Sequence, residues 1–310
     1  MASLFNALPG AVSQGMIWGI MAIGLYITYK ILELSDLTVD GSFATGGAVC
    51  AMLMAGGWNV WAAMGVAFVV GMATGWVTSF FHTKLGIPAI LSGILTQLAL
   101  YSLNLRILAI GSDATTKATL PLSVDNQQLL LSSRYIRALA LNNPIVLLLA
   151  LVLIVIGGLY WFFGTELGSS LRATGANPNM ARAQGINTNF SKVLALIVSN
   201  GLVAMSGALL AQYQGSATVD MGRGAIVIGL AAVIIGEVLF SKGSLNFALK
   251  LASCIVGAII YYVVITLVLR LGLESTDLKL LTALVVAIFL TIPYWKGKYF
   301  TKAKGGRGHA

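Results

Sequence analysis

The sequence predicts an all-α, polytopic membrane protein folded as a single transmembrane domain over residues 1–310. Charged residues make up only 9% of the chain and hydrophobic residues 58%, with a mean hydropathy of +0.89, whereas soluble domains carry about 25% charged residues. Apolar runs close to the ~20 residues that span a bilayer recur along the chain. We expect about nine transmembrane helices (roughly 8–10), over Val12–Tyr29, Gly41–Ala55, Val60–Phe81, Pro88–Ile110, Ile145–Phe163, Val193–Gln212, Ala225–Phe240, Phe247–Leu269 and Leu280–Tyr294.

The basic residues predict how these spans are oriented. With alternating spans, twelve Lys and Arg residues fall on one side of the membrane and seven on the other. Four of the seven lie in or beside one long loop, where charge has less influence. The positive-inside rule therefore places the N-terminus outside and Ser170–Phe190 in the cytoplasm, together with the C-terminal tail. No Lys or Arg precedes Lys30, and no removable signal peptide is expected before the first span.

Three segments between or after the spans differ in composition. Residues 111–144 form an extracytoplasmic loop whose second half, "LLLSSRYIRALAL", suits a short amphipathic helix on the outer surface. This loop has two open interpretations, a plain connector and a docking surface. Residues 165–192 form a cytoplasmic loop. Residues 296–310 form a basic cytoplasmic tail, which we interpret as an interfacial anchor and not as a nucleic-acid site.

A short sequence echo raises the hypothesis of two halves with inverted topology. "LTVDGSFATGG" follows the first span, and "ATVDMGRGAIVIG" follows the sixth. Each Thr-Val-Asp precedes a segment rich in Gly and Ala. Asp40 is expected near the cytoplasmic side and Asp220 near the outside, as in the inverted repeats of many transporters.

Several kinds of chemistry lack their sequence signatures. The chain has no Walker A, HExxH or GxSxG pattern, and its two histidines, His82 and His309, are far apart. Cys50 and Cys254 lie in apolar segments without CxxC or Cys/His spacing. We therefore expect no nucleotide site of the Walker type, no metal site and no intramembrane protease.

Ionisable residues within spans are costly and are therefore candidates for a functional role. Glu33, Asp36, Asp40 and Glu237 are all expected close to the cytoplasmic boundary. Their alternative role there is as interfacial caps, with Asp40 at the start of the following helix. A carrier driven by protons or sodium would use a carboxylate deep in the bundle, and the sequence predicts none.

Neutral polar residues add to this candidate path. Gln97 and Asn104 are seven positions apart and share one helical face. Such residues either form hydrogen bonds between helices or line a substrate path, and both roles stay open. The complete set of candidate path residues is Asp40, Ser42, Ser92, Gln97, Asn104, Asn200 and Glu237.

The polar segment "ANPNMARAQGIN" predicts a short cytoplasmic helix. Asn177 suits the N-cap, Pro178 the first helical position, and Gly185 the left-handed position after the helix. A helix of about two turns does not persist alone in water, so it needs a surface to lie against. An ordinary basic loop is the alternative. The residues expected to meet a partner are Met180, Ala181 and Arg182.

Together with two later segments, this stretch resembles the permeases of bacterial ABC importers in the branched-chain amino acid/ribose permease superfamily. The resemblance covers nearly the whole chain and is strongest in the cytoplasmic segment. It is closest to the branch for tryptophan or tyrosine uptake. Glu237 is a departure, because many relatives continue with glycine there. The matching residues are Arg172, Ala173, Gly175, Asn177, Ala181, Gly185 and Ile186, then Ser206, Gly207 and Leu209, then Gly229, Ala232, Val233, Ile234 and Gly236.

The resemblance implies a subunit of a larger importer in the bacterial cytoplasmic (inner) membrane. Its expected partners are a second copy of the chain, two ABC ATPase subunits and an extracytoplasmic substrate-binding protein. ATP and magnesium would bind the ATPase, and no cofactor is expected on this chain. The substrate would be an amino acid with an aromatic or other hydrophobic side chain. Nucleosides or sugars carried by the same machinery, and a stand-alone secondary carrier, are the alternatives. The residues that would couple to the ATPase are Arg172, Asn177, Pro178, Met180, Ala181, Arg182 and Gly185.

Overall fold

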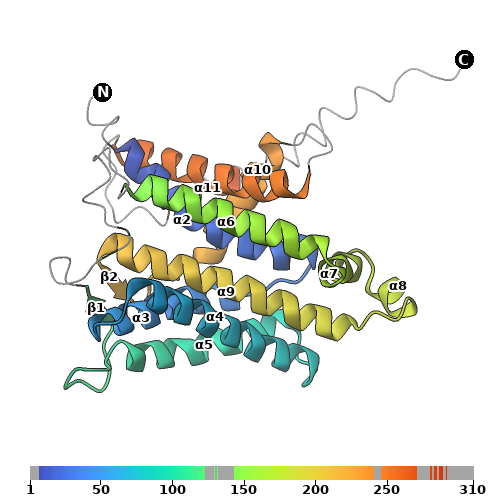
Figure 1. The fold of residues 1–310 in the computed structure, drawn as a ribbon, viewed down its shortest axis with the longest axis horizontal. Helices are drawn as coiled ribbons and strands as arrows, with labels where there is room; N and C mark the ends of the chain where they lie inside the picture. Colours follow the sequence, from blue (N-terminus) through green and yellow to red (C-terminus); the bar gives the residue numbers. More distant parts are fainter. Residues whose placement is uncertain are drawn as a thin grey trace, which may run out of the picture.

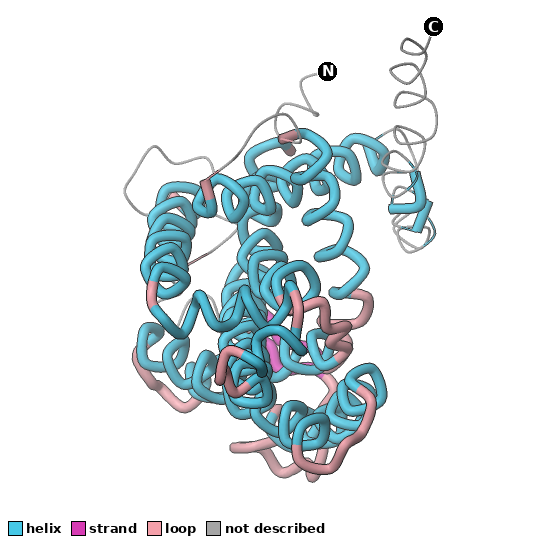
Figure 2. The backbone as a smooth tube through the Cα atoms, turned by 90° about the vertical axis from the view of Figure 1, so that its right-hand side faces the viewer, coloured by secondary structure: helices cyan, strands magenta, loops and turns pink. Residues whose placement is uncertain are grey.

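The computed structural model describes residues 7–122, 143–240 and 246–270, with isolated positions at 129, 131, 280, 283, 284, 286–288 and 291. These residues form a bundle of helices that lie side by side (Figure 1) and are seen nearly end-on in Figure 2. Seven of the described helices are long and apolar enough to cross a membrane, which confirms the all-α polytopic class. The long helices are α2 (Leu8–Tyr26, continued by the π-helix η1, Ile27–Ile31), α3 (Thr38–Ala55), α4 (Val60–Thr83), α5 (Ala89–Ile107), α6 (Pro144–Gly164), α9 (Thr188–Gln214) and α11 (Phe247–Arg270).

Three shorter helices and two short strands complete the described chain. α7 (Glu166–Ala176) and α8 (Pro178–Ala183) follow α6, and α10 (Ala225–Leu239) precedes α11. β1 (Thr119–Pro121) pairs antiparallel with β2 (Ser216–Thr218).

The span predicted at Ala225–Phe240 differs from the helix that forms there. α10 has 15 residues, or about 22 Å of helix, against the ~30 Å hydrocarbon thickness of a bilayer. The count of nine spans is therefore not confirmed. The ninth, Leu280–Tyr294, lies mostly outside the described residues, as do the tail at 296–310 and the expected amphipathic helix of the 111–144 loop.

The bundle has two distinct ends, which we call the strand end and the α8 end. β1 and β2 lie at the first, and α7 and α8 at the second (Figure 1). Two hydrogen bonds pair α2 antiparallel with α9: Ser199 Oγ donates to Gly24 O (2.7 Å) and Ser206 Oγ to Ile17 O (2.6 Å). The beginning of α2 and helix α8 therefore lie at opposite ends. Which of these ends faces the cytoplasm stays a prediction.

Glycines let the central helix α9 approach its neighbours closely. A Cβ atom at Gly207 in α9 would overlap the backbone carbonyl oxygen of Phe43 in α3, and one at Gly46 would overlap that of Ala204. Apolar side chains gain little by leaving lipid for one another, so close backbone packing of this kind stabilises membrane helices. It fixes the positions of α3 and α9, which carry three of the seven candidate path residues, Asp40, Ser42 and Asn200.

Candidate functional site

Helix α8 is built from local signals, as the sequence predicts. The side-chain Oδ1 of Asn177 accepts hydrogen bonds from the backbone N–H groups of Asn179 and Met180, both at 3.1 Å. Pro178 occupies the first helical position. Gly185 has φ +81°. The N–H of Gly185 donates to Arg182 O (2.9 Å), and the next N–H, of Ile186, donates to Ala181 O (3.0 Å). This double closure is the Schellman motif, which needs a left-handed residue after the helix.

The side chains of α8 divide into an inward and an outward set. Met180 is 63% exposed, whereas Ala181 is 4% exposed. In this structure Ala181 faces its own chain, and its contact with a partner stays a prediction. Arg182 is exposed, but its Nε donates to Thr188 Oγ1 at 2.9 Å and ties α8 to the first turn of α9.

Helix α7 connects α8 to the bundle. A guanidinium nitrogen of Arg172 donates to Phe163 O at 2.7 Å, and the same group lies 5.8 Å from the ring centroid of Phe247. Gly175 lies against the carbonyl oxygen of Ile31, where a Cβ would have no room. A displacement of α8 would thus reach α6, α11 and the end of α2. In this structure Arg172 binds its own chain, while Met180 faces outward.

A buried polar network joins α3, α4 and α9 around one carboxylate. Asn200 Nδ2 donates to Asp36 Oδ2 (2.7 Å), and Ser42 Oγ donates to Asn200 Oδ1 (2.6 Å). The hydroxyls of Ser42 and Thr74 are 2.7 Å apart. The backbone N–H of Thr38 donates to Asp36 Oδ1 at 2.9 Å. Asp36 is 2% exposed, and no ion pair links it to a cation in the described part of the chain.

This network corrects the predicted depth of Asp36 and Asp40. Asn200 lies twelve residues after Thr188, the start of α9, which is about 18 Å into the helix, so Asp36 lies near mid-bundle and not at a boundary. The chain reaches this depth because it turns back after η1. Glu33, with φ +54°, is the one non-glycine residue with positive φ among those described.

Asp40 joins the two segments that carry the Thr-Val-Asp echo. Its carboxylate accepts from the backbone N–H groups of Gly224 (3.0 Å) and Ile226 (2.9 Å), at the N-terminus of α10. α3 continues toward the strand end, where Cys50 accepts from Gln212 (3.4 Å), while α10 runs toward the α8 end. The echo thus starts two helices of opposite direction. Inverted symmetry of the complete halves stays a prediction.

A cavity of about 330 Å³ opens beside Asp40, between α3, α5 and the segment before α10. It brings together three of the predicted path residues, Asp40, Gln97 and Asn104, with Tyr101, Val219 and Arg223. Ser42 and Asn200 belong to the buried network instead. Ser92 is fully buried and donates to Ala89 O at 2.8 Å. Asp36 is the residue that the candidate path omitted, although its spacing of two from Thr38 is typical of an Asx turn.

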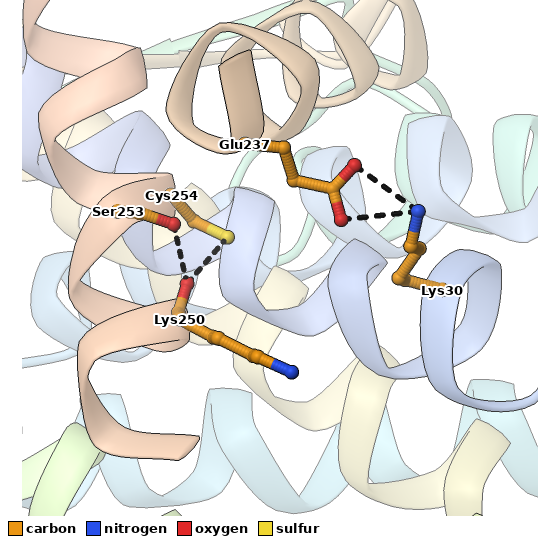
Figure 3. Close-up of polar contacts among 5 residues, drawn as sticks. All are labelled: Lys30, Glu237, Lys250, Ser253 and Cys254. Atoms are coloured by element: carbon orange, nitrogen blue, oxygen red, sulfur yellow. Dashed lines mark hydrogen bonds and ion pairs between the residues drawn. The ribbon is translucent and has the colours of Figure 1, made fainter. Parts of the chain in front are cut away.

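Glu237 lies apart from this cavity. Its carboxylate forms an ion pair with Lys30 Nζ at 3.0 and 3.1 Å, between the last turn of α10 and η1 (Figure 3). Figure 3 also shows Lys250 of α11 near this pair, where its carbonyl oxygen accepts from Ser253 and Cys254. Both partners of the pair are partly exposed, so its contribution to stability is small. The Lys30–Glu237 pair thus contacts the end of α10, whereas Asp40 contacts its start.

The described residues contain no group of three or more His, Cys, Asp or Glu side chains that would hold a metal ion. The polar groups lie in three places: the cavity beside Asp40, the network around Asp36, and helix α8 at one end of the bundle.

Comparison with known proteins shows the family of this chain. The family described as "Branched-chain amino acid transport system / permease component" matches residues 8–291. A tyrosine transport system permease protein of Clostridioides difficile (strain R20291) is 40% identical over 285 residues, which cover 92% of this chain and 90% of the relative. A ribose import permease protein of Escherichia coli (strain K12) is 24% identical over 290 residues, 94% of this chain and 85% of the relative.

A probable branched-chain amino acid transport permease protein of Methanocaldococcus jannaschii is 24% identical over 244 residues, 77% of this chain and 76% of the relative. No solved structure matches the chain. The family resemblance in the sequence is thereby confirmed over most of the chain. The protein belongs to the branched-chain amino acid transport system permease component family: it is a membrane-spanning permease component of an ABC-type transport system, and not an enzyme.

Proposed function

We propose that this permease is the translocation subunit of an ATP-driven importer that receives its substrate from an extracytoplasmic binding protein. Two copies of the chain pair with two ATPase subunits, each of which receives one α8 in a groove. The N-terminus lies outside, and α8 and the C-terminal tail lie in the bacterial cytoplasm. The observation that carries this proposal is α8 itself: a capped helix of six residues, too short to persist alone, that presents Met180 outward.

The coupling follows from the contacts of α7 and α8. Closure of an ATPase dimer around α8 would move α7, which bears on α6, α11 and the end of α2 through Arg172 and Gly175. ATP binding would then favour one of two permease conformations by its differential contacts with α8. The hydrolytic chemistry, with ATP and magnesium, resides on the ATPase.

We propose an amino acid with an aromatic or other hydrophobic side chain as the substrate. The relative described as a tyrosine permease supports this choice, since it shares 40% identity over most of both chains. Nucleosides or sugars are the alternative within the same machinery, supported by the more distant ribose permease.

A stand-alone secondary carrier is the second candidate, because Asp36 is a carboxylate deep in the bundle. Uptake into proteoliposomes that contain the permease alone, or the permease with its ATPase and binding protein, separates the two. The importer requires ATP and the ATPase, and uptake persists when an ionophore collapses ion gradients. Ion-driven uptake by the permease alone would establish the carrier.

Met180→Glu tests the coupling role of α8. We expect ATPase co-purification and ATP-dependent uptake each to fall at least about tenfold. The reason is that a carboxylate buried in an apolar contact loses its hydration without gaining a partner. Thermal unfolding of the purified permease should not change, since Met180 is exposed.

Leu85→Glu is the matched control for this test. Leu85 is also an exposed apolar side chain, 58% against 63% for Met180, but it lies in the turn between α4 and α5. We expect this variant to keep its ATPase. If both variants retain co-purification and coupled uptake, α8 is not the coupling helix.

A further inference from the structure

The cavity beside Asp40 has the dimensions of a small-molecule site. Its volume of about 330 Å³ lies at the lower end of the ~300–1,000 Å³ of ligand pockets. Gly41 and Ala44 of α3 and Leu98 of α5 give it apolar walls, while Asp40, Asn104 and Arg223 add polar groups. An apolar cleft with a few convergent polar groups is the usual form of a binding site.

The unpaired side chain of Asn104 indicates that this cavity takes a polar ligand. The residue is 1% exposed, yet among the residues that the structure describes neither its side-chain oxygen nor its nitrogen has a hydrogen-bond partner. An unpaired buried amide costs about 1–3 kcal/mol, and nearly all such groups in native proteins are paired. Asn104 is one of the residues that line the cavity, so a molecule bound there is the candidate partner for its amide group.

The cavity also offers one group of each charge. Each oxygen of Asp40 accepts one backbone N–H of the α10 terminus, which leaves further lone pairs for a donor. Arg223 Nε lies 2.8 Å from Asp220, and its guanidinium lies 5.6 Å from the ring centroid of Tyr101. Among the described residues no other hydrogen bond engages the Arg223 side chain. Asp40 thus suits an ammonium group and Arg223 a carboxylate.

We propose that this cavity binds an α-amino acid as a zwitterion, with its ammonium at Asp40 and its carboxylate at Arg223. Asn104 completes its hydrogen bonds with the ligand, and the ligand side chain lies against Leu98 and Tyr101. A sugar carries no charge, so it would offer no oppositely charged group to Asp40 or to Arg223. This inference rests on the proposed importer function and specifies where and how its substrate binds within the membrane subunit.

A matrix of ligands and variants tests the two ionic contacts. The complete permease–ATPase complex in nanodiscs, without binding protein, is titrated by saturation-transfer NMR with L-tyrosine, tyramine, 3-(4-hydroxyphenyl)propionate and D-ribose. We expect Asp40→Asn to weaken L-tyrosine and tyramine about tenfold and to leave the propionate unchanged. We expect Arg223→Gln to weaken L-tyrosine and the propionate about tenfold and to leave tyramine unchanged.

Other outcomes of this matrix overturn the assignment. Equal weakening of all three phenolic ligands by either variant would mean that the residue only shapes the fold, as a cap of α10 would. Absence of L-tyrosine binding to the unmodified complex, or binding of D-ribose as tight as that of L-tyrosine, would also reject it. ATP-dependent uptake, measured separately with the binding protein, tells whether the importer function survives that rejection.

Asn104→Leu separates binding from folding. Because the Asn104 amide has no hydrogen-bond partner among the described residues, leucine should raise the thermal unfolding midpoint while it weakens the binding of L-tyrosine about tenfold. Thr96→Val is the control on the same helix, since Thr96 accepts from Thr78 (3.0 Å) outside the cavity, and it should leave L-tyrosine affinity unchanged. A lower midpoint with unaltered affinity in Asn104→Leu would assign the residue a structural role and overturn the proposal.

Discussion

Replacing Asp36 with alanine is expected to lower the free energy of unfolding of the permease by about 2–3 kcal/mol. The reason is the pairing of Asp36 with Asn200 near mid-bundle. Removal of the carboxylate leaves the Asn200 amide group and the Thr38 N–H without the acceptors that they use at 2.7 and 2.9 Å. Thermal or denaturant unfolding of the purified protein in detergent measures this loss.

A conservative variant of Asp36 and a surface control test the origin of this loss of stability. Asp36→Asn offers one acceptor where two donors converge, so we expect it to lose about half as much stability as alanine. Asp113→Ala removes an exposed carboxylate from the loop before β1 and should change stability by less than about 0.5 kcal/mol. Equal stability of the Asp36→Ala and Asp113→Ala proteins would show that the buried network does not hold α3 to α9.

Gly207→Ala is expected to have the larger effect, a loss of about 3 kcal/mol or failure to accumulate in the membrane. The added methyl group would overlap the carbonyl oxygen of Phe43. Since that atom belongs to the backbone of α3, no side-chain rotation relieves the clash, and α3 must move away from α9. The displacement would separate Ser42 from Asn200, which are bonded at 2.6 Å.

Gly65→Ala provides the matched control in another membrane helix. A Cβ at Gly65 in α4 has no heavy atom within 4 Å, so alanine adds helix propensity without a clash. We expect equal or slightly greater stability, by up to about 1 kcal/mol. The packing assignment fails if Gly207→Ala accumulates and unfolds like the Gly65→Ala protein.

Local properties of the chain predicted much of this structure. Apolar runs placed the long helices within a few residues of their observed bounds, because burial in hydrocarbon requires every backbone group to bond within its own helix. Caps were equally predictable: Asn177, Pro178 and Gly185 form the ends of α8 through bonds that span at most five residues. Such interactions depend on near neighbours alone.

The outward face of α8 was not predictable in the same way. The sequence assigned Met180, Ala181 and Arg182 to one surface, yet Ala181 is buried and Arg182 binds Thr188. Which side of a two-turn helix is covered depends on how α7 and α9 approach it. That approach is set by contacts such as Gly175 on Ile31, between residues distant in the sequence.

The amino-acid sequence by itself determined the class of the protein, the course of its long helices and the capped helix α8, because these depend on hydropathy and short-range hydrogen bonds. Only the tertiary structure decided that the chain after η1 turns back into the bundle. This turn buries Asp36 beside Asn200 and places Asp40 at the start of α10. Packing also decided that Asn104 lines a cavity with no hydrogen-bond partner among the described residues. The physical reason is that depth and pairing arise from packing between α3, α5, α9 and α10, segments whose bonded residues are as many as 186 positions apart in the chain.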